Sequence, residues 1–279
     1  MLAAKRSLHL VRAGEEILLE TDTDHGHLRI EQDPSRPSGR LVYLDGVASS
    51  YIDLDDPSHL EFGYLRRFTD IISAFWPAPA PLRVTHVGGG AVSLPRQVSD
   101  TRPRSTQVVY EYDGALIEIA REHLGLITFP GLKIKIGDAR PRMDRRSAGS
   151  ADVVVCDAVF CRNVPPMLSS IEYVRQVRTV LATDGIYLLN VIDGPDLHLS
   201  RRHAATLRTV FPTVLLSADP DVLAGKVNGN LVFLATQRKA REVPLGAIVR
   251  SCMSGTYPDR VIRPEDIAEF AAGAPVLTD

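Results

Sequence analysis

The stretch Val84-Thr85-His86-Val87-Gly88-Gly89-Gly90 decides the fold of this chain. An apolar run that breaks into consecutive glycines is typical of a β-strand that ends in a nucleotide-binding turn. Glycine lets the backbone turn sharply and approach a ligand, and the following helix offers free N–H groups and the positive end of its dipole. The stretch therefore predicts a nucleoside site at Gly88, Gly89 and Gly90 in an α/β protein.

Three further apolar runs lie downstream, and each delivers an acid at its carboxyl end. The acids and their runs are Glu111 after 107–110, Asp138 after 132–136, and Asp157 after 151–156. Ligands of open parallel sheets bind at the carboxyl ends of the strands. Glu111 also stands about 20 residues beyond the glycines, where a carboxylate accepts hydrogen bonds from ribose hydroxyls.

Segments with helical spacing lie between these runs, at 114–123 and 171–181. Upstream, alternating runs separated by turn-rich segments predict short strands at 17–20, 28–32 and 40–44. We therefore predict an α/β fold with a doubly wound, mostly parallel sheet of the Rossmann type in residues 57–279. A small antiparallel β appendage precedes it in residues 1–56.

A nicotinamide dehydrogenase is the first competing interpretation, because its fingerprint also opens with Gly-x-Gly and ends with an acid. The third small position of that fingerprint is Ser93 here, and nothing in it requires the later Gly137-Asp138. His86, inside the first strand of the sheet, is predicted to be a hydrogen-bonded core histidine and not a catalyst.

The order of three glycines, Glu111-Tyr112-Asp113, Gly137-Asp138-Ala139 and strand-terminal Asp157 resembles class I S-adenosylmethionine-dependent transferases, and among them the spermidine synthase family. Leu44-Asp45-Gly46 is similar to the Leu-Asp-Gly segment that leads into that family's active site. The resemblance covers roughly residues 40 to 240. It implies a class I methyltransferase-like fold.

The resemblance also implies roles for individual residues. Glu111 would hold the ribose hydroxyls, Tyr112 would pack on the adenine, and Asp138 with Ala139 would meet the adenine edge. Asp157 would face the reacting centre. A carboxylate suits that place because the donor is a sulfonium cation and the attacking amine must lose a proton, so the chemistry needs no metal.

The chain departs from the family on the amine side. Ala91 stands where the family has an acid after the glycines, and Phe160 stands where a second acid follows the first. His59 falls where the family has a substrate-facing tyrosine, and helical spacing in 60–75 places Glu61 on a helix near the pocket. These departures argue against putrescine, because its cationic ends need acidic partners when desolvated.

Three functions remain open. The first is aminopropyl transfer from decarboxylated S-adenosylmethionine to an amine other than putrescine. The second is methyl transfer from S-adenosylmethionine to a small molecule, which the loss of the acid at Ala91 favours. The third is a non-catalytic protein that binds a nucleoside.

Composition excludes several classes of partner. The 279 residues carry a net charge of −2, which gives no electrostatic reason to expect a nucleic-acid or membrane partner. The basic clusters Arg140–Arg146 and Arg201–His203 are predicted to face solvent. We expect a cytoplasmic protein with reduced cysteines, since no signal peptide or membrane-spanning run is visible. The family resemblance implies a homodimer.

Overall fold

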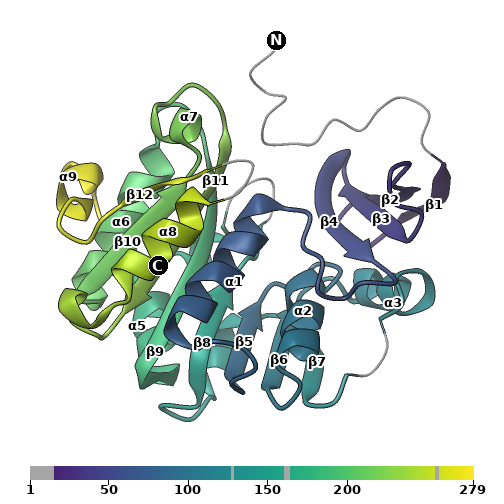
Figure 1. Cartoon of the computed structure of the whole chain (residues 1–279), viewed down its shortest axis with the longest axis horizontal. Coiled ribbons are helices and arrows are strands. Elements are labelled where there is room, and N and C mark those ends of the chain that lie inside the picture. Colours follow the sequence, from purple (N-terminus) through teal and green to yellow (C-terminus); the bar gives the residue numbers. More distant parts are fainter. Residues whose placement is uncertain (1–15, 127–128, 160–163, 255–257) are drawn as a thin grey trace.

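The structure is a computed structural model that describes residues 16–126, 129–159, 164–254 and 258–279. Two β-sheets organise these residues, a small antiparallel one and a large mixed one (Figure 1). The strands are β1 (Ile17–Asp22), β2 (His27–Gln32), β3 (Gly39–Leu44), β4 (Val47–Asp53), β5 (Arg83–Val87), β6 (Thr106–Glu111), β7 (Leu132–Ile136), β8 (Ala151–Cys156), β9 (Leu181–Asp193), β10 (Thr213–Ala218), β11 (Gly229–Thr236) and β12 (Arg260–Ile262).

Helices connect most strands of the large sheet. They are α1 (Gly63–Phe75), α2 (Ser93–Thr101), α3 (Gly114–His123), α4 (Arg140–Asp144), α5 (Ile171–Val180), α6 (His198–Val210), α7 (Pro220–Leu223), α8 (Leu245–Met253) and α9 (Ile267–Ala271), with short 3₁₀ turns η2 (Pro166–Leu168) and η3 (Ala240–Glu242). Because α1 begins at Gly63, the prediction that Glu61 lies on this helix is wrong. The helix begins three residues after the start of the segment with helical spacing, because the backbone of its N-cap residue, Phe62, is extended.

The large sheet has the strand order β12-β10-β11-β9-β8-β5-β6-β7. Strands β5 to β9 pair in parallel, whereas β10, β11 and β12 join by antiparallel pairing. The chain moves from β5 outward through β6 to β7 and then returns to the other side of β5 with β8. The boundary between β5 and β8 is thus the topological switch point, where open α/β sheets bind their ligands.

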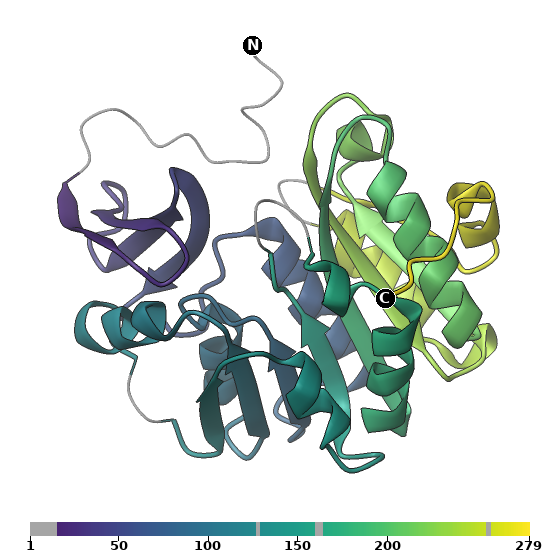
Figure 2. The same ribbon diagram turned by 180° about the vertical axis from the view of Figure 1, so that it is seen from behind.

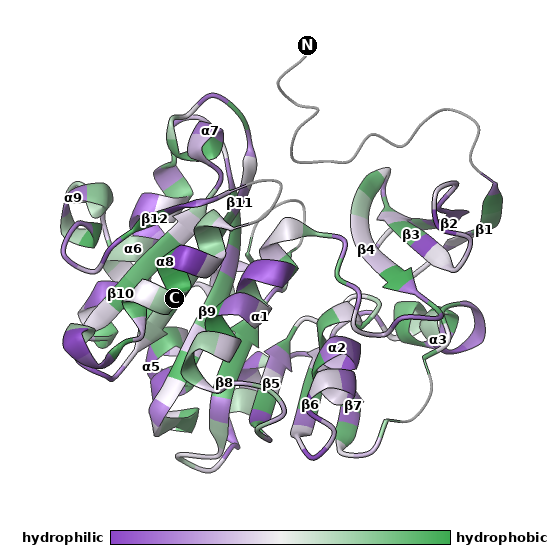
Figure 3. Cartoon of the chain, viewed as in Figure 1, coloured by the Kyte–Doolittle hydropathy of each residue, from purple (hydrophilic) through white to green (hydrophobic). Residues whose placement is uncertain are grey.

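Hydrophobic layers on both faces explain why the central strands are mostly apolar (Figure 3). On one face, α1, α2 and α8 form one hydrophobic cluster with alternate residues of the sheet, such as Val153 and Val155 of β8 (Figure 1). On the other face, α5 and α6 pack on Val154 and Cys156 of the same strand (Figure 2). The predicted doubly wound sheet is confirmed.

The four-stranded sheet β1-β2-β3-β4 is antiparallel throughout, as predicted for the N-terminal appendage. Its inner face, including Leu28 and Ile52, shares a core with α2 and α3, where it contacts the cluster that contains Val92 and Ile117. This packing fixes β4 beside the glycine turn. In the described part of the chain, no helix is both long enough and apolar enough to cross a membrane.

Candidate active site

The glycine turn follows β5 and needs glycine for two reasons. Gly88 has a φ of +80° and Gly90 a φ of +49°, in the left-handed region that L side chains avoid. A Cβ atom on Gly88 would lie 2.7 Å from the backbone oxygen of Asp157 and from the backbone nitrogen of Ala158. The turn and the end of β8 therefore approach more closely than any side chain would permit.

Glu111, at the end of β6, organises this turn with its carboxylate. One oxygen accepts the N–H groups of Gly89 (2.7 Å) and Gly90 (2.9 Å), and the other accepts those of Tyr112 (2.8 Å) and Asp113 (3.0 Å). Four N–H groups therefore converge on a side chain that is 9% exposed. The predicted acid and the predicted glycines thus form one structural unit.

Asp157 lies directly after β8, on the other side of the switch point. Its backbone N–H donates to the carbonyl of Val87 (2.9 Å), which places it beside the glycine turn. Its carboxylate accepts the hydroxyl of Tyr64 (3.0 Å) and the amide of Asn190 (2.9 Å). Burial raises the pKa of Asp157 to about 6, although the hydrogen bonds from Asn190 and Tyr64 oppose this shift.

Tyr64 and Asn190 are the two site residues that sequence reasoning missed. Tyr64 comes from the first turn of α1, and Asn190 comes from β9, so the three partners lie far apart in the sequence. The ring of Tyr64 stacks on Phe62 and meets Phe68 edge-on, with centroids 6.1 Å and 5.9 Å away. The one local signal in the sequence was Tyr64 itself, an aromatic residue whose ring carries a polar hydroxyl group.

Exposed apolar side chains gather at the carboxyl edge of the parallel strands. Tyr112 follows β6 and is 62% exposed, Ile136 ends β7 and is 41% exposed, and Val159 after β8 is 37% exposed. Met167 in η2 is half exposed at the loop that continues from β8. The ring of Tyr112 contacts that of His25 from the β1–β2 turn, with centroids 4.6 Å apart. Such a patch beside polar groups is typical of a ligand-binding surface.

Asp138 and Ala139 form the turn between β7 and α4. The carboxylate of Asp138 accepts the backbone N–H of Arg140 (2.8 Å), and the side chain of Ala139 is buried. The carboxylate of Asp138 is therefore engaged at the start of α4, whose N-cap residue is Ala139. The backbone N–H of Gly137 donates to the carbonyl of Glu111 (2.7 Å), so this turn and the ribose-binding candidate lie side by side.

His59 and Glu61 are hydrogen-bonded just before α1, with 3.0 Å between the imidazole nitrogen and the carboxylate. The imidazole also lies against the ring of Tyr51 from β4, at a centroid distance of 5.5 Å. These contacts join the two predicted substrate residues to each other and to the N-terminal sheet. Phe160, the third predicted substrate residue, lies outside the described residues.

Ala91 and Ser50 close the glycine turn from the side of the N-terminal sheet. Ala91 is fully buried, and its backbone N–H donates to the hydroxyl of Ser50 in β4 (3.1 Å). A Cβ atom on Gly90 would lie 2.7 Å from the same hydroxyl. This side of the turn therefore presents a neutral hydroxyl, and the methyl group of Ala91 packs in the core that the N-terminal sheet shares with α3.

Other features of the described residues lie apart from this site. His86 is buried, its imidazole N–H donates to the amide oxygen of Gln107 (2.8 Å), and burial lowers its pKa to about 4, which confirms a core histidine. Among the described residues, no group of histidines, cysteines and acids is arranged to hold a metal.

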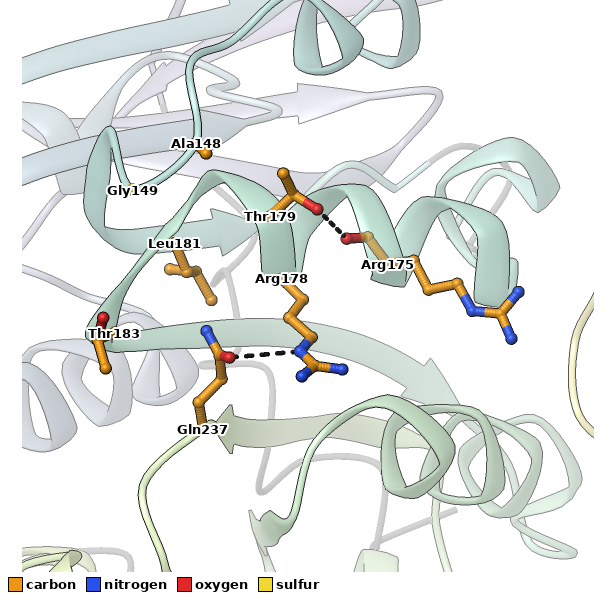
Figure 4. A pocket seen from close by; sticks show the side chains of 8 residues that line it. All are labelled: Ala148, Gly149, Arg175, Arg178, Thr179, Leu181, Thr183 and Gln237. Atoms are coloured by element: carbon orange, nitrogen blue, oxygen red, sulfur yellow. Dashed lines mark hydrogen bonds between the residues drawn. The ribbon is translucent and has the colours of Figure 1, made fainter.

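A depression of about 650 Å³ lies at the opposite edge of the sheet, where Figure 4 shows Arg178 turned toward Gln237 and Arg175 pointing away. None of the predicted site residues lines it.

Comparisons with known proteins show which proteins this chain is similar to. No protein-family model matches the chain. The polyamine aminopropyltransferase of Neisseria meningitidis serogroup B is 27% identical over 205 residues, which cover 71% of this chain and 72% of that protein. The polyamine aminopropyltransferase of Aeropyrum pernix is 29% identical over 138 residues, which cover 47% of this chain. That match spans only 43% of the Aeropyrum protein's own length.

Solved structures extend the similarity to the whole fold. A probable spermidine synthase from Corynebacterium glutamicum has a TM-score of 0.87 and 29% identity, covering 95% of this chain and 97% of that chain. Human methyltransferase-like protein 13 in complex with SAH has a TM-score of 0.57 and 19% identity, covering 75% of this chain and 92% of that chain, and it shows the fold alone. In sequence and in fold, the chain is therefore similar to the spermidine synthases, on a class I methyltransferase-like scaffold.

Proposed function

We propose that this protein transfers an aminopropyl group from decarboxylated S-adenosylmethionine to an amine. The observation that carries the proposal is the position of Asp157, held by Tyr64 and Asn190 at the switch point beside the glycine turn. A nucleoside donor and a group able to accept a proton would meet there. The similarity to aminopropyltransferases supports this reaction over others that use the same scaffold.

The donor would bind along the carboxyl edge of β5, β6 and β7. Glu111 would accept the ribose hydroxyls, and because its four acceptor positions are now taken by N–H groups, the hydroxyls would share or replace some of these bonds. Tyr112 would pack on the adenine, for which its exposed ring beside Ile136 is suited. Asp138 and Ala139 would meet the adenine edge.

Asp157 would orient the amine and receive its proton. The amine nitrogen attacks the methylene group bonded to sulfur, so a C–N bond forms while the C–S bond breaks and its electron pair returns to sulfur. Methylthioadenosine leaves as a neutral thioether, and the proton of the attacking nitrogen passes to Asp157. The carboxylate also stabilises the sulfonium cation before the bond breaks, and the hydrogen bonds from Tyr64 and Asn190 hold it in one orientation.

We propose that the acceptor is an amine other than putrescine, bound with the help of His59, Glu61 and Phe160. The carboxylate of Glu61 is already hydrogen-bonded to the imidazole of His59, and Asp157 is the carboxylate nearest the proposed reacting centre. A desolvated ammonium needs an acidic partner at each cationic end. An acceptor with one ammonium therefore fits this arrangement better than a diamine.

An amine screen tests the proposal directly. The purified protein is incubated with decarboxylated S-adenosylmethionine and a panel of monoamines and diamines, and release of methylthioadenosine is followed by chromatography with mass spectrometry of the amine product. We expect a monoamine to gain one aminopropyl group faster than putrescine does. Asp157→Asn should abolish product, whereas Asp152→Asn, an ion-paired acid on the same strand, should not. Release of methylthioadenosine with no amine, or with no dependence on Asp157, would contradict the mechanism.

Methyl transfer is the second candidate, and the surroundings of Ala91 favour it. The aminopropyl donor ends in a bare ammonium, whereas S-adenosylmethionine carries an additional carboxylate that an acid at position 91 would repel. The methyl of Ala91 and the hydroxyl of Ser50 present no such charge. Formation of S-adenosylhomocysteine from S-adenosylmethionine, and none of methylthioadenosine, would select this candidate.

We also propose a cytoplasmic homodimer that pairs through the N-terminal sheet. Its edge strand β1 exposes the large apolar side chains of Ile17 and Leu18. The described cysteines, Cys156 and Cys252, are free thiols, which suits a reducing compartment. Sedimentation of the wild type against Ile17→Lys should separate a dimer from a monomer, and a monomeric wild type would contradict the proposal.

A further inference from the structure

The C-terminal segment 272–279 is tied to the α/β core by its backbone. The carbonyl of Leu277 accepts the N–H of Ile171, and the N–H of Leu277 donates to the hydroxyl of Thr206 (2.8 Å and 2.9 Å). The first bond satisfies an N–H group at the start of α5 that has no partner within the helix. Val276 packs against the core on this face of the sheet. The segment is therefore docked across α5 and α6.

Asp279 ends this segment in a bidentate ion pair with Arg140. The two guanidinium nitrogens donate to the two carboxylate oxygens at 3.0 Å and 2.7 Å. The side chain of Arg140 is 18% exposed, so the prediction that its basic cluster simply faces solvent is wrong for this residue. His203 of the second cluster is buried and also contradicts that prediction. The error at Arg140 arose because the sequence does not show where the C-terminal segment returns, and the error at His203 arose because this side chain lies on the buried face of α6.

Arg140 connects the C-terminal segment to two walls of the proposed donor site. Its backbone N–H donates to the carboxylate of Asp138, in the turn that is proposed to meet the adenine edge. Its guanidinium donates to the carbonyl of Met167 in η2 and to the hydroxyl of Ser170 (3.3 Å), and it lies over the ring of Tyr173. One side chain thus spans the turn before α4, the loop after β8 and the C-terminal segment.

We propose that Asp279 is a positioning residue for the donor site. It acts through Arg140, which holds the turn at Asp138 and the η2 turn in fixed positions relative to each other. This inference rests on the proposed function, because it assumes that the nucleoside binds between those two walls. A planar guanidinium fixed by two parallel bonds has one orientation, whereas the same group without its carboxylate samples several. Asp279 touches neither donor nor acceptor, so its effect falls on donor binding and not on the chemical step.

The test compares Asp279→Asn with Glu118→Gln, a matched loss of an exposed carboxylate that pairs with an arginine on α3. We expect Asp279→Asn to weaken methylthioadenosine binding about 3- to 10-fold and to raise KM for the donor by the same factor. Turnover at saturating donor should stay within about twofold of the wild type. Glu118→Gln should leave both quantities unchanged. Arg140→Lys should weaken binding as much, and adding Asp279→Asn to it should weaken binding no further.

Amide hydrogen exchange without ligand separates this inference from the proposed function. In Asp279→Asn, exchange in residues 138–143 and 166–170 should accelerate relative to the wild type and to Glu118→Gln. Unchanged exchange in both segments, or donor affinity equal to that of the wild type, would overturn the positioning role. If the wild type binds no nucleoside while exchange still accelerates, the proposed function fails and the structural connection through Arg140 stands.

Discussion

Replacing Asp157 by asparagine should stabilise the protein at alkaline pH while it removes activity. In the native fold, burial raises the pKa of this carboxyl from an ordinary value of 3.8 to about 6. The folded state therefore binds the proton more tightly than the unfolded chain does, and stability falls as pH rises through this interval. For these two pKa values, linkage gives a loss of about 1.4 kcal/mol between about pH 5 and about pH 8.

Asparagine fits the same place, because its amide oxygen accepts from Asn190 and its amide nitrogen donates to the oxygen of Tyr64. The free energy of unfolding, measured by urea titration at both pH values, should fall less for Asp157→Asn than for the wild type. Because Asp157 is half-buried and solvent screens its charge, the difference between the two proteins in this loss of stability should be at most about 1.4 kcal/mol.

Asp152→Asn serves as the control, since Asp152 pairs with Arg83 at the other end of β8. Equal pH dependence in the wild type and Asp157→Asn would refute the reasoning, as would destabilisation by Asp157→Asn at alkaline pH. The same variant should lower the transfer rate by about 10²- to 10⁴-fold if Asp157 takes the proton.

Three further variants test the site. Gly88→Ala should destabilise the fold by at least about 2 kcal/mol, because its Cβ would meet the backbone of Asp157 and its φ is positive; thermal melting measures this loss. Glu111→Gln places amide hydrogens against backbone N–H groups, so we expect at least tenfold weaker methylthioadenosine binding in calorimetry, and unchanged binding would exclude Glu111 from the donor site. Tyr64→Phe removes a hydrogen bond that lowers the pKa of Asp157, so the acid limb of the rate profile should move to higher pH while donor affinity stays constant.

Much of the scaffold was predictable because most strands of the large sheet are recognisable from a local run of residues in the sequence. The run 132–136 and the run 151–156 match β7 and β8 at both ends. β8 is apolar because it is buried on both faces, whereas β7 alternates apolar residues with lysines, as an edge strand does. Strand β4 was missed, because Ser49 and Ser50 interrupt its apolar pattern. The hydroxyl of Ser49 donates to a carbonyl of β3, and the hydroxyl of Ser50 accepts an N–H group from the glycine turn. Neither contact can be predicted from the local sequence.

The nucleoside side of the site was more predictable than the amine side. The glycines and Glu111 follow strands that lie next to each other, so a fixed spacing along the sequence brings them together. Tyr64 and Asn190 reach Asp157 from α1 and β9, through contacts between segments 93 and 33 residues apart. No spacing rule relates such positions. Tyr64 also fits the apolar pattern of α1, whereas Asn190 is a polar residue within the apolar strand β9.

Calorimetric titration with methylthioadenosine, decarboxylated S-adenosylmethionine and S-adenosylmethionine tests the central claim most directly. The account predicts that all three nucleosides compete for one site and that the decarboxylated donor binds more tightly than S-adenosylmethionine. Tighter binding of S-adenosylmethionine would replace aminopropyl transfer by methyl transfer. Absence of binding for all three would contradict the nucleoside site at Gly88, Gly89, Gly90 and Glu111.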